Sequence, residues 1–333
     1  MRIRQSEDTL LQGIRGAAAS WKHLAGFLKL GMGDDAALVN PTRGYETILT
    51  CDWFLEGTHF LRDKHPADAV GWKCLARAVS DVAAMGGVPR CFLLSLALPK
   101  SLTGRWLDDF LGGLRRASRR FGCALAGGDT TRQSKILINV TVVGEVLKGE
   151  AILRSSARVG DIIYVSGRLG EAEAGLRLVR SAAGKAPRSA RLLKKHFYPE
   201  PRQSLGNWLA QKQLATAMLD ISDGLSSDLA RLCGASRVGA EIEAAKLPAV
   251  RISESERKRS CDEIELALYG GDDYELLFTV PSKKAKKMPG AYEGVPLTAI
   301  GKITHGRETV VVDQAGDKRK LKGKGWDPFH AEA

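Results

Sequence analysis

Residues 66–99, PADAVGWKCLARAVSDVAAMGGVPRCFLLSLALP, place two different hydrophobic patterns side by side. The first part predicts a helix, with a proline in its first turn and two glycines after its end. The second part, RCFLLSLALP, is an apolar run of strand length. A helix that leads directly into a strand indicates a mixed fold class, α/β or α+β.

The same mixture continues on both sides of this stretch. ETILTCDWF predicts a strand that ends at Asp52, residues 102–121 predict a helix, CALAGGD predicts a strand that runs into a turn, and ILINVTVVGEV predicts a further strand. In the second half, DIIYVSG, LATAMLDIS and GAEIEA predict strands. Helices are expected at 170–183, near 205–211 and from DGLSSDLARLC onward, with a basic loop between the first two.

The chain is too long for one ordinary hydrophobic core, because 333 residues correspond to about two domains. A polar segment, LKGEAILRSSARVGD, precedes the strand DIIYVSG and is typical of a boundary between domains. We therefore expect one domain at residues 1–148 and a second at residues 149–333.

The composition, 44% hydrophobic and 26% charged, is typical of a globular protein. No apolar run approaches the roughly 20 residues that span a bilayer, and no secretory signal pattern is found, so we expect a cytoplasmic protein without a membrane partner. The six cysteines are scattered singly without zinc-site spacing, which indicates reduced thiols in the core.

The net charge of +12 keeps nucleic-acid binding open as an alternative function. The excess charge is dispersed, its local runs contain no interleaved aromatic residues, and no helix-turn-helix or RNP pattern is present. A solvated basic surface is therefore the favoured interpretation, and no nucleic-acid partner is expected.

Aspartates follow apolar runs at several distant places in the chain, and most of them stand near glycines. This set comprises Asp34, Asp35, Asp52, Asp129, Asp220, Asp223, Asp272 and Asp273. Asp81 differs, because it lies within the predicted helix at the margin of its buried stripe. Because open α/β sheets place ligands at strand ends, we expect several of these carboxylates to gather there.

Crowded carboxylates repel one another and lose hydration, so they need Arg or Lys partners or hard divalent cations such as Mg²⁺. Any single Asp has an alternative role in a turn or helix cap, and Asp223 before GLSSDL is a credible cap. The glycines in GMG, AGGD, SDG and YGGDD offer backbone N–H groups to phosphate oxygens. Acids with glycine turns indicate a metal-nucleotide site, although neither a P-loop nor a protein-kinase catalytic loop occurs.

Eight ordered motifs resemble those of the thiamine-monophosphate kinase family, within the aminoimidazole-ribotide synthetase-like superfamily. They are GMGDDAALV, TCDWFLEGTHF, GWKCLARAVSDVAAMGGVPR, AGGDTTR, LRSSARVGD with YVSGRLGEAEAGL, LDISDGLSSDL, GGDDYELLFTV and GWDPF. SDVAAMGG and GGDTT alone also fit other ATP-using members, such as a ribotide cyclo-ligase, which stays open as an alternative.

The resemblance implies the superfamily's two-domain fold and the ATP-dependent phosphorylation of thiamine monophosphate to thiamine diphosphate, the last step of thiamine diphosphate biosynthesis. It implies ATP as co-substrate, several Mg²⁺ ions and a homodimer whose N-terminal sheets pair in a barrel. The N-terminal domain would bind ATP and Mg²⁺ and dimerise, and the C-terminal domain would complete the active site.

Carried over residue by residue, the resemblance implies three groups of site residues. The magnesium ligands would be Asp35, Thr50, Cys51, Asp52, Asp81, Asp129, Asp220 and Asp223. The ATP contacts would be Gly128, Asp129, Arg154 and Ser222. The thiamine-phosphate contacts would be His59, Asp272 and Trp326. No nucleophile or general base is expected, because a phosphate monoester is already ionised near neutral pH.

Four of these residues carry an alternative or a departure from the family pattern. Cys51 stands where members often have Thr, so a backbone carbonyl ligand would survive the change and a hydroxyl ligand would not. Asp272 stands where Glu is common, so its carboxylate reaches about one methylene less far. His59 has an alternative role as a satisfied loop histidine, and Trp326 as a packing residue.

Overall fold

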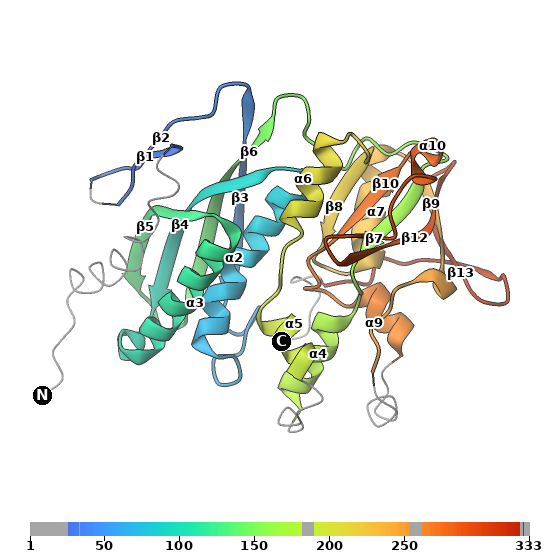
Figure 1. Cartoon of the computed structure of the whole chain (residues 1–333). Helices are drawn as coiled ribbons and strands as arrows, with labels where there is room; N and C mark the ends of the chain where they lie inside the picture. Colours follow the sequence, from blue (N-terminus) through green and yellow to red (C-terminus); the bar gives the residue numbers. More distant parts are fainter. Residues whose placement is uncertain (1–25, 33, 182–189, 253–261, 327–328, 330–333) are drawn as a thin grey trace, which may run out of the picture. The chain divides into compact units, whose positions relative to one another are not determined.

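The computed structural model describes residues 26–32, 34–181, 190–252, 262–326 and 329. The chain forms two units, each with its own sheet (Figure 1). Unit 1 comprises Met1–Val82 and Gly87–Gly149, and unit 2 comprises Ala83–Gly86 and Glu150–Ala333.

Unit 1 is built on a four-stranded sheet with the strand order β3-β6-β4-β5. Its strands are β3 (Tyr45–Leu55), β4 (Val88–Leu98), β5 (Ala124–Arg132) and β6 (Leu137–Leu147). β4 and β5 are parallel, and the other neighbours are antiparallel. A separate pair is formed by the short strands β1 (Leu28–Leu30) and β2 (Leu38–Val39).

Helices α2 (Ala67–Ala84) and α3 (Arg105–Phe121) cover one face of this sheet, and a 3-10 turn at Lys100–Leu102 precedes α3 (Figure 1). Alternate side chains of β3 follow this division, because successive residues of a strand point to opposite faces. Ile48 and Phe54 are buried, whereas Leu49 is 71% exposed and Trp53 is 55% exposed. The face of β3 opposite the helices therefore carries large apolar side chains that are open to solvent in the single chain.

Unit 2 contains an eight-stranded sheet with the order β14-β13-β9-β12-β7-β10-β8, to which β11 adds by pairing with β12. The strands are β7 (Ile162–Ser166), β8 (Ala217–Ile221), β9 (Gly239–Glu243), β10 (Glu275–Val280), β11 (Ala291–Tyr292), β12 (Val295–Thr304), β13 (Thr309–Val312) and β14 (Lys318–Lys320). β9 and β13 are parallel, and the other pairs are antiparallel.

The helices of unit 2 bury both faces of β10. The helices are α4 (Glu171–Arg180), α5 (Ala190–Phe197), α6 (Gln203–Gln211), α7 (Leu225–Ser236), α9 (Glu263–Tyr269) and α10 (Ser282–Ala285), with a 3-10 turn at Ala244–Lys246. Leu277 of β10 belongs to a core that includes Leu229 of α7. Phe278, the next residue, belongs to a second core that includes Leu209 of α6. A sheet with a core on each face explains why every residue of β10 is buried.

Three sequence expectations about secondary structure are wrong. β3 continues three residues past Asp52, and β5 continues three residues past Asp129, so neither aspartate lies at a strand end. The expected basic loop contains helix α5, whose Leu192 is buried. LALY, which precedes the GGDD glycines, ends helix α9, so Asp272 follows a helix and not a strand.

The described cysteines are all free thiols, and four of the five are buried, as expected. Cys51 is the exception, because its side chain is exposed. Cys261 lies outside the described residues. Over the described part of the chain, no helix has the length and hydropathy needed to cross a membrane.

Candidate active site

In unit 1, β3 and α2 bring two of the expected magnesium ligands into contact. The Thr50 hydroxyl donates to the Asp81 carboxylate at 2.5 Å. Asp52 lies two residues further along β3 and so faces the same side as Thr50. Cys51 faces the opposite side, where its Sγ lies 3.1 Å from Nδ2 of Asn139. The Cys51 side chain therefore points away from the Thr50–Asp81 pair.

A second group of expected ligands lies around β5. Asp129 is exposed, and its carboxylate accepts a hydrogen bond from the backbone N–H of Thr130 at 2.9 Å. Gly128 has a φ of 153°, and a Cβ there would lie 1.9 Å from the carbonyl oxygen of Leu94. Only glycine therefore lets β5 approach β4 this closely.

The segment between β1 and β2 carries the remaining acids of unit 1. Asp35 is exposed, and its backbone N–H donates to the Asp34 carboxylate at 2.9 Å, so Asp34 stabilises the local turn.

The strand order keeps the β3 and β5 groups apart within unit 1. β3 and β5 are the two edge strands of the sheet. Three strand spacings of about 4.8 Å separate them by about 14 Å. Across the described residues, no three His, Cys, Asp or Glu side chains are grouped as a metal site.

His59 lies in the turn that follows β3. The backbone N–H of Leu55 donates to Nδ1 of His59 at 3.0 Å, which places the proton of the neutral ring on Nε2. The imidazole also lies 5.8 Å from the ring of Phe54, centre to centre. These contacts fix the ring orientation and its tautomer.

In unit 2, the end of β8 and the turn that precedes α7 carry three expected site residues, Asp220, Ser222 and Asp223. Asp220 is buried within β8. Asp223 is not the cap of α7, because the N-cap residue is Gly224 and no side chain caps it. The turn is instead held by Asp228, whose carboxylate accepts the backbone N–H groups of Ser222 and Asp223 at 3.1 Å each.

Arg231 joins the two carboxylates at this turn. Its guanidinium lies 2.5 Å from the Asp223 carboxylate and 2.6 Å from the Asp228 carboxylate. Burial raises the pKa of Asp228 to about 6, and the neighbouring Asp223 adds to the shift while Arg231 opposes it. At this turn a single cation, Arg231, therefore pairs with two acids, Asp223 and Asp228.

Two further loops of unit 2 bond directly to the 222–223 turn. The backbone N–H of Asp272 donates to the carbonyl of Ser222 at 2.8 Å, and that of Trp326 donates to the carbonyl of Asp223 at 2.9 Å. A Cβ on Gly325 would lie 2.0 Å from the Asp223 carbonyl oxygen, so glycine is required beside this contact. Ser222, Asp223, Asp272 and Trp326 thus come together from three distant parts of the sequence.

Arg154 lies at the other end of α7. Its carbonyl accepts a hydrogen bond from the hydroxyl of Ser236, the last residue of the helix, at 2.8 Å. The 12 residues of α7 span about 18 Å. Its main chain is therefore placed a helix length away from Asp223.

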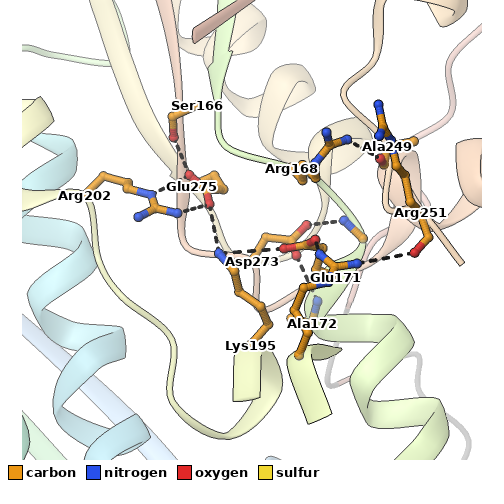
Figure 2. Close-up of polar contacts among 12 residues, drawn as sticks. Ser166, Arg168, Glu171, Ala172, Lys195, Arg202, Ala249, Arg251, Asp273 and Glu275 are labelled. Atoms are coloured by element: carbon orange, nitrogen blue, oxygen red, sulfur yellow. Dashed lines mark hydrogen bonds and ion pairs between the residues drawn. The ribbon is translucent and has the colours of Figure 1, made fainter. Parts of the chain in front are cut away.

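A buried ionic network lies beside the Asp272 loop (Figure 2). Glu275 accepts from Nε of Arg202 at 2.6 Å and from the Ser166 hydroxyl at 2.6 Å, and Lys195 lies 3.8 Å away. These cations hold the pKa of Glu275 below its usual value in spite of burial. Glu171 pairs with Lys195 at 3.7 Å and with Arg191.

Sequence reasoning missed Asp228, Arg231, Ser236 and Tyr274, which hold site loops in place. Asp228 follows Asp223 by five residues in SDGLSSDL, where the second acid was a visible signal. Arg231 is three residues further along the same helix, a spacing at which opposite charges meet. No local signal marks Ser236, because its partner Arg154 is 82 residues away.

Two family models match the chain. The model for the N-terminal domain of AIR synthase related proteins matches residues 33–146, and the model for the C-terminal domain matches residues 158–314. Together they cover most of both units.

Similar proteins of known name are thiamine-monophosphate kinases. That of Escherichia coli K12 is 38% identical over 91% of this chain and 92% of its own length. That of Bacillus subtilis is 34% identical over 90% of this chain and 93% of its own length.

Solved structures agree with these sequence matches. The crystal structure of thiamine-monophosphate kinase from Stenotrophomonas maltophilia matches with a TM-score of 0.78 and 36% identity, over 92% of this chain and 96% of that one. AaThiL complexed with AMPPCP and TMP matches with a TM-score of 0.76 and 34% identity, over 98% of each chain. Escherichia coli HypE, a hydrogenase maturation protein, shares the fold at 20% identity and a TM-score of 0.77, over 98% of this chain and 99% of that one.

Proposed function

Because the chain belongs to the thiamine-monophosphate kinase family, within the AIR synthase related proteins, we propose that it transfers the γ-phosphoryl group of ATP to thiamine monophosphate. The products are thiamine diphosphate and ADP. The observation that carries the proposal is the meeting of Ser222, Asp223, Asp272 and Trp326 at one turn of unit 2. These are residues expected to bind ATP, metal and the acceptor substrate.

The two substrates follow from the family and from its solved complex. AaThiL is complexed with AMPPCP and TMP, and it matches this chain over 98% of its length. We assign ATP contacts to Gly128, Asp129, Arg154 and Ser222. We assign thiamine-phosphate contacts to His59, Asp272 and Trp326.

The expected magnesium ligands fit a hard divalent cation. Side-chain carboxylates and hydroxyls dominate the set, and Mg²⁺ prefers such oxygen donors. The contact between Thr50 and Asp81 already pairs two of them at 2.5 Å. The set is Asp35, Thr50, Cys51, Asp52, Asp81, Asp129, Asp220 and Asp223, with Cys51 contributing its carbonyl, since its side chain faces Asn139. When bound, Mg²⁺ neutralises charge on phosphate oxygens.

The protein's own residues position the reactants and take no part in covalent chemistry. The acceptor phosphate is already ionised near neutral pH, so no general base is needed. The guanidinium of Arg154 offers a fork of donors to ATP phosphates. The Leu55 backbone N–H fixes the orientation of the His59 ring, which we assign to the thiamine-phosphate contact. The Trp326 indole, 37% exposed, offers a face to the cationic thiazolium.

A homodimer through the open sheet face of unit 1 accounts for the separation of its two acid groups. Leu49, Trp53 and Leu93 expose 71%, 55% and 41% of their surface on that face. Two such sheets facing each other would bury this apolar surface. Closure into a barrel would set the β3 edge of one chain beside the β5 edge of its partner. Asp52 of one chain and Asp129 of the other would then be neighbours.

Each domain has a distinct part in this proposal. Residues 1–148 supply the dimer face and the acids on β3, α2 and β5. Residues 149–333 supply the 222–223 turn, the Asp272 loop and the Trp326 segment.

The direct test is incubation of the purified full chain with Mg-ATP and thiamine monophosphate, followed by chromatographic detection of thiamine diphosphate. A panel of other acceptors, including a ribotide substrate of cyclo-ligases, is assayed for ADP release under the same conditions. We expect product only with thiamine monophosphate. Faster ADP release with another acceptor, and no thiamine diphosphate, would contradict the proposed function.

A further inference from the structure

The loop that carries Asp272 has an unusual backbone. Asp272 and Tyr274 both have positive φ angles, 66° and 50°, in the left-handed region. Side chains other than glycine are strained there, and Asp and Asn tolerate the region best. An Asp at 272, where Glu is the common family form, therefore suits this backbone. A loop with two such residues keeps its shape only if surrounding contacts hold it.

Main-chain contacts hold the loop on the side of β8. The backbone N–H of Asp272 donates to Ser222 at 2.8 Å, and that of Tyr274 donates to the carbonyl of Ile221 at 2.9 Å. These two hydrogen bonds fix the backbone positions of both residues relative to the end of β8. They leave the direction of the Asp272 side chain to other groups.

Asp273 holds the loop on the opposite side, at the start of α4 (Figure 2). Its carboxylate accepts the backbone N–H of Gly170 at 2.6 Å and that of Ala172 at 3.1 Å. The Asp273 side chain is 8% exposed. It thus satisfies two donors at the first turn of a helix that is 100 residues distant in sequence.

Tyr274 directs the Asp272 side chain itself. Its hydroxyl donates to Oδ1 of Asp272 at 2.6 Å, whereas its ring is buried with 2% exposure. A hydroxyl that donates to a carboxylate makes a short, charge-assisted hydrogen bond, which fixes the direction of the carboxylate. Phenylalanine would fill the same space, so the hydroxyl is the part of Tyr274 that acts on Asp272.

We propose that Tyr274 is a positioning residue for the phosphate-acceptor site, and that its hydroxyl orients the carboxylate of Asp272 toward the thiamine portion of the substrate. This inference rests on the proposed function, in which Asp272 binds thiamine monophosphate. Tyr274 acts through Asp272 and does not touch the reacting phosphates. Removing the hydroxyl therefore weakens acceptor binding without slowing the transfer itself.

The test is the variant Tyr274→Phe in the full chain, assayed by thiamine diphosphate formation. We expect KM for thiamine monophosphate to rise about tenfold, the equivalent of one charge-assisted hydrogen bond. We expect kcat and KM for ATP to stay within about twofold of the parent values. An unchanged KM for thiamine monophosphate, with turnover intact, would overturn the positioning role and leave the proposed function standing.

Tyr164→Phe is the matched control. Tyr164 is also buried in unit 2, and its hydroxyl donates to the carbonyl of Ala285 at 3.4 Å, which lies on α10. Tyr164→Phe therefore removes the same hydroxyl oxygen, but at a place away from the Asp272 loop. We expect its kinetic constants to match those of the parent chain. Equal rises in KM for both variants would mean a general effect of losing a buried hydroxyl, and would overturn the proposal.

A double-mutant cycle with Asp272→Ala separates action through Asp272 from action on the fold. Once the carboxylate is removed, Tyr274→Phe should change KM for thiamine monophosphate no further. Additive effects of the two substitutions on KM would overturn the positioning role. The role would also be overturned if thermal unfolding showed that the Tyr274→Phe chain does not fold. Absence of thiamine diphosphate with the parent chain would instead refute the proposed function and, with it, the acceptor role of Asp272.

Discussion

The two units hold their site residues in different ways. In unit 2, main-chain hydrogen bonds draw the Asp272 and Trp326 segments onto the 222–223 turn, so the loops meet without any ligand. In unit 1, the acids lie on β3 and β5, and the sheet itself keeps them at opposite edges. Unit 2 thus holds its expected site residues together through its own main-chain contacts, whereas the sheet of unit 1 keeps the acids on β3 and β5 apart.

The largest expected effect comes from removing one acid in each unit. Asp52→Asn and Asp223→Asn should each lower kcat by roughly a thousandfold or more, because each removes a carboxylate that would hold the Mg²⁺ whose charge offsets phosphate repulsion. Thermal unfolding should change by only a few degrees, since neither variant changes core packing. The exposed Asp63→Asn is a control that should keep full activity. Full activity in both site variants would refute the metal assignment.

The second prediction concerns the open sheet face of unit 1. Leu49→Glu places a charge on an apolar surface that is 71% exposed in the single chain. If that surface pairs with a second copy, burial of the charge should dissociate the dimer at micromolar concentration and lower activity. Sedimentation velocity measures the change. A parent chain that is monomeric at high concentration, or a variant that stays dimeric, would contradict the proposed interface.

The third prediction uses the buried acid at α4. Burial raises the pKa of Asp273 to about 7, although its two backbone donors oppose the shift; Glu275 adds to it, and Lys195 opposes it. Because the folded pKa exceeds the unfolded one, the contribution of Asp273 to stability is complete below about pH 4 and is lost as pH rises toward 7.

Urea unfolding of the parent chain and of Asp273→Asn at pH 5 and pH 8 measures this linkage. The variant has no acid to titrate there, so the parent should lose on the order of 2 kcal/mol more than the variant between these pH values. Glu171 and Arg202 belong to the same ionic network and remain in both chains. Parallel pH profiles of the two chains would contradict the raised pKa.

The smallest expected effect is that of Trp326→Ala. Loss of a cation–π contact of about 0.5–2 kcal/mol should raise KM for thiamine monophosphate roughly two- to thirtyfold, with little change in KM for ATP. Trp106→Ala, at a tryptophan that stacks on Phe110 in α3, is a control for loss of an indole. An unchanged KM in Trp326→Ala would count against stacking on the substrate.

Hydrophobic period predicted the main helices and strands of unit 1 and the first strands of unit 2, but two strand ends in unit 1 were wrong. GGD in β5 was taken as the start of a turn, because glycine usually interrupts strands. Its actual reason is the contact with Leu94, which only the folded sheet reveals. β3 likewise continues through Asp52, because its pairing with β6 extends to Leu55.

In the candidate site, too, sequence signals marked some residues and gave no indication of others. The glycine and aspartate motifs singled out Asp223 and Asp272, because those signals are local, whereas Ser222 and Trp326 came only from the family resemblance. The groups that hold the turn were not visible, since Asp273 meets Gly170 across 103 positions of sequence. The basic run at Arg191 was interpreted as a loop because its buried partner, Glu171, is known only from packing.

The central claim is that the expected acids bind the metal that accompanies ATP. The most direct measurement is a titration of Mn²⁺ into the full chain with the non-hydrolysable analogue AMPPCP, followed by electron paramagnetic resonance of the free ion. We predict that Asp52→Asn and Asp223→Asn each weaken Mn²⁺ binding at least tenfold, whereas Asp63→Asn does not. Parent affinity and stoichiometry in both site variants would contradict the claim.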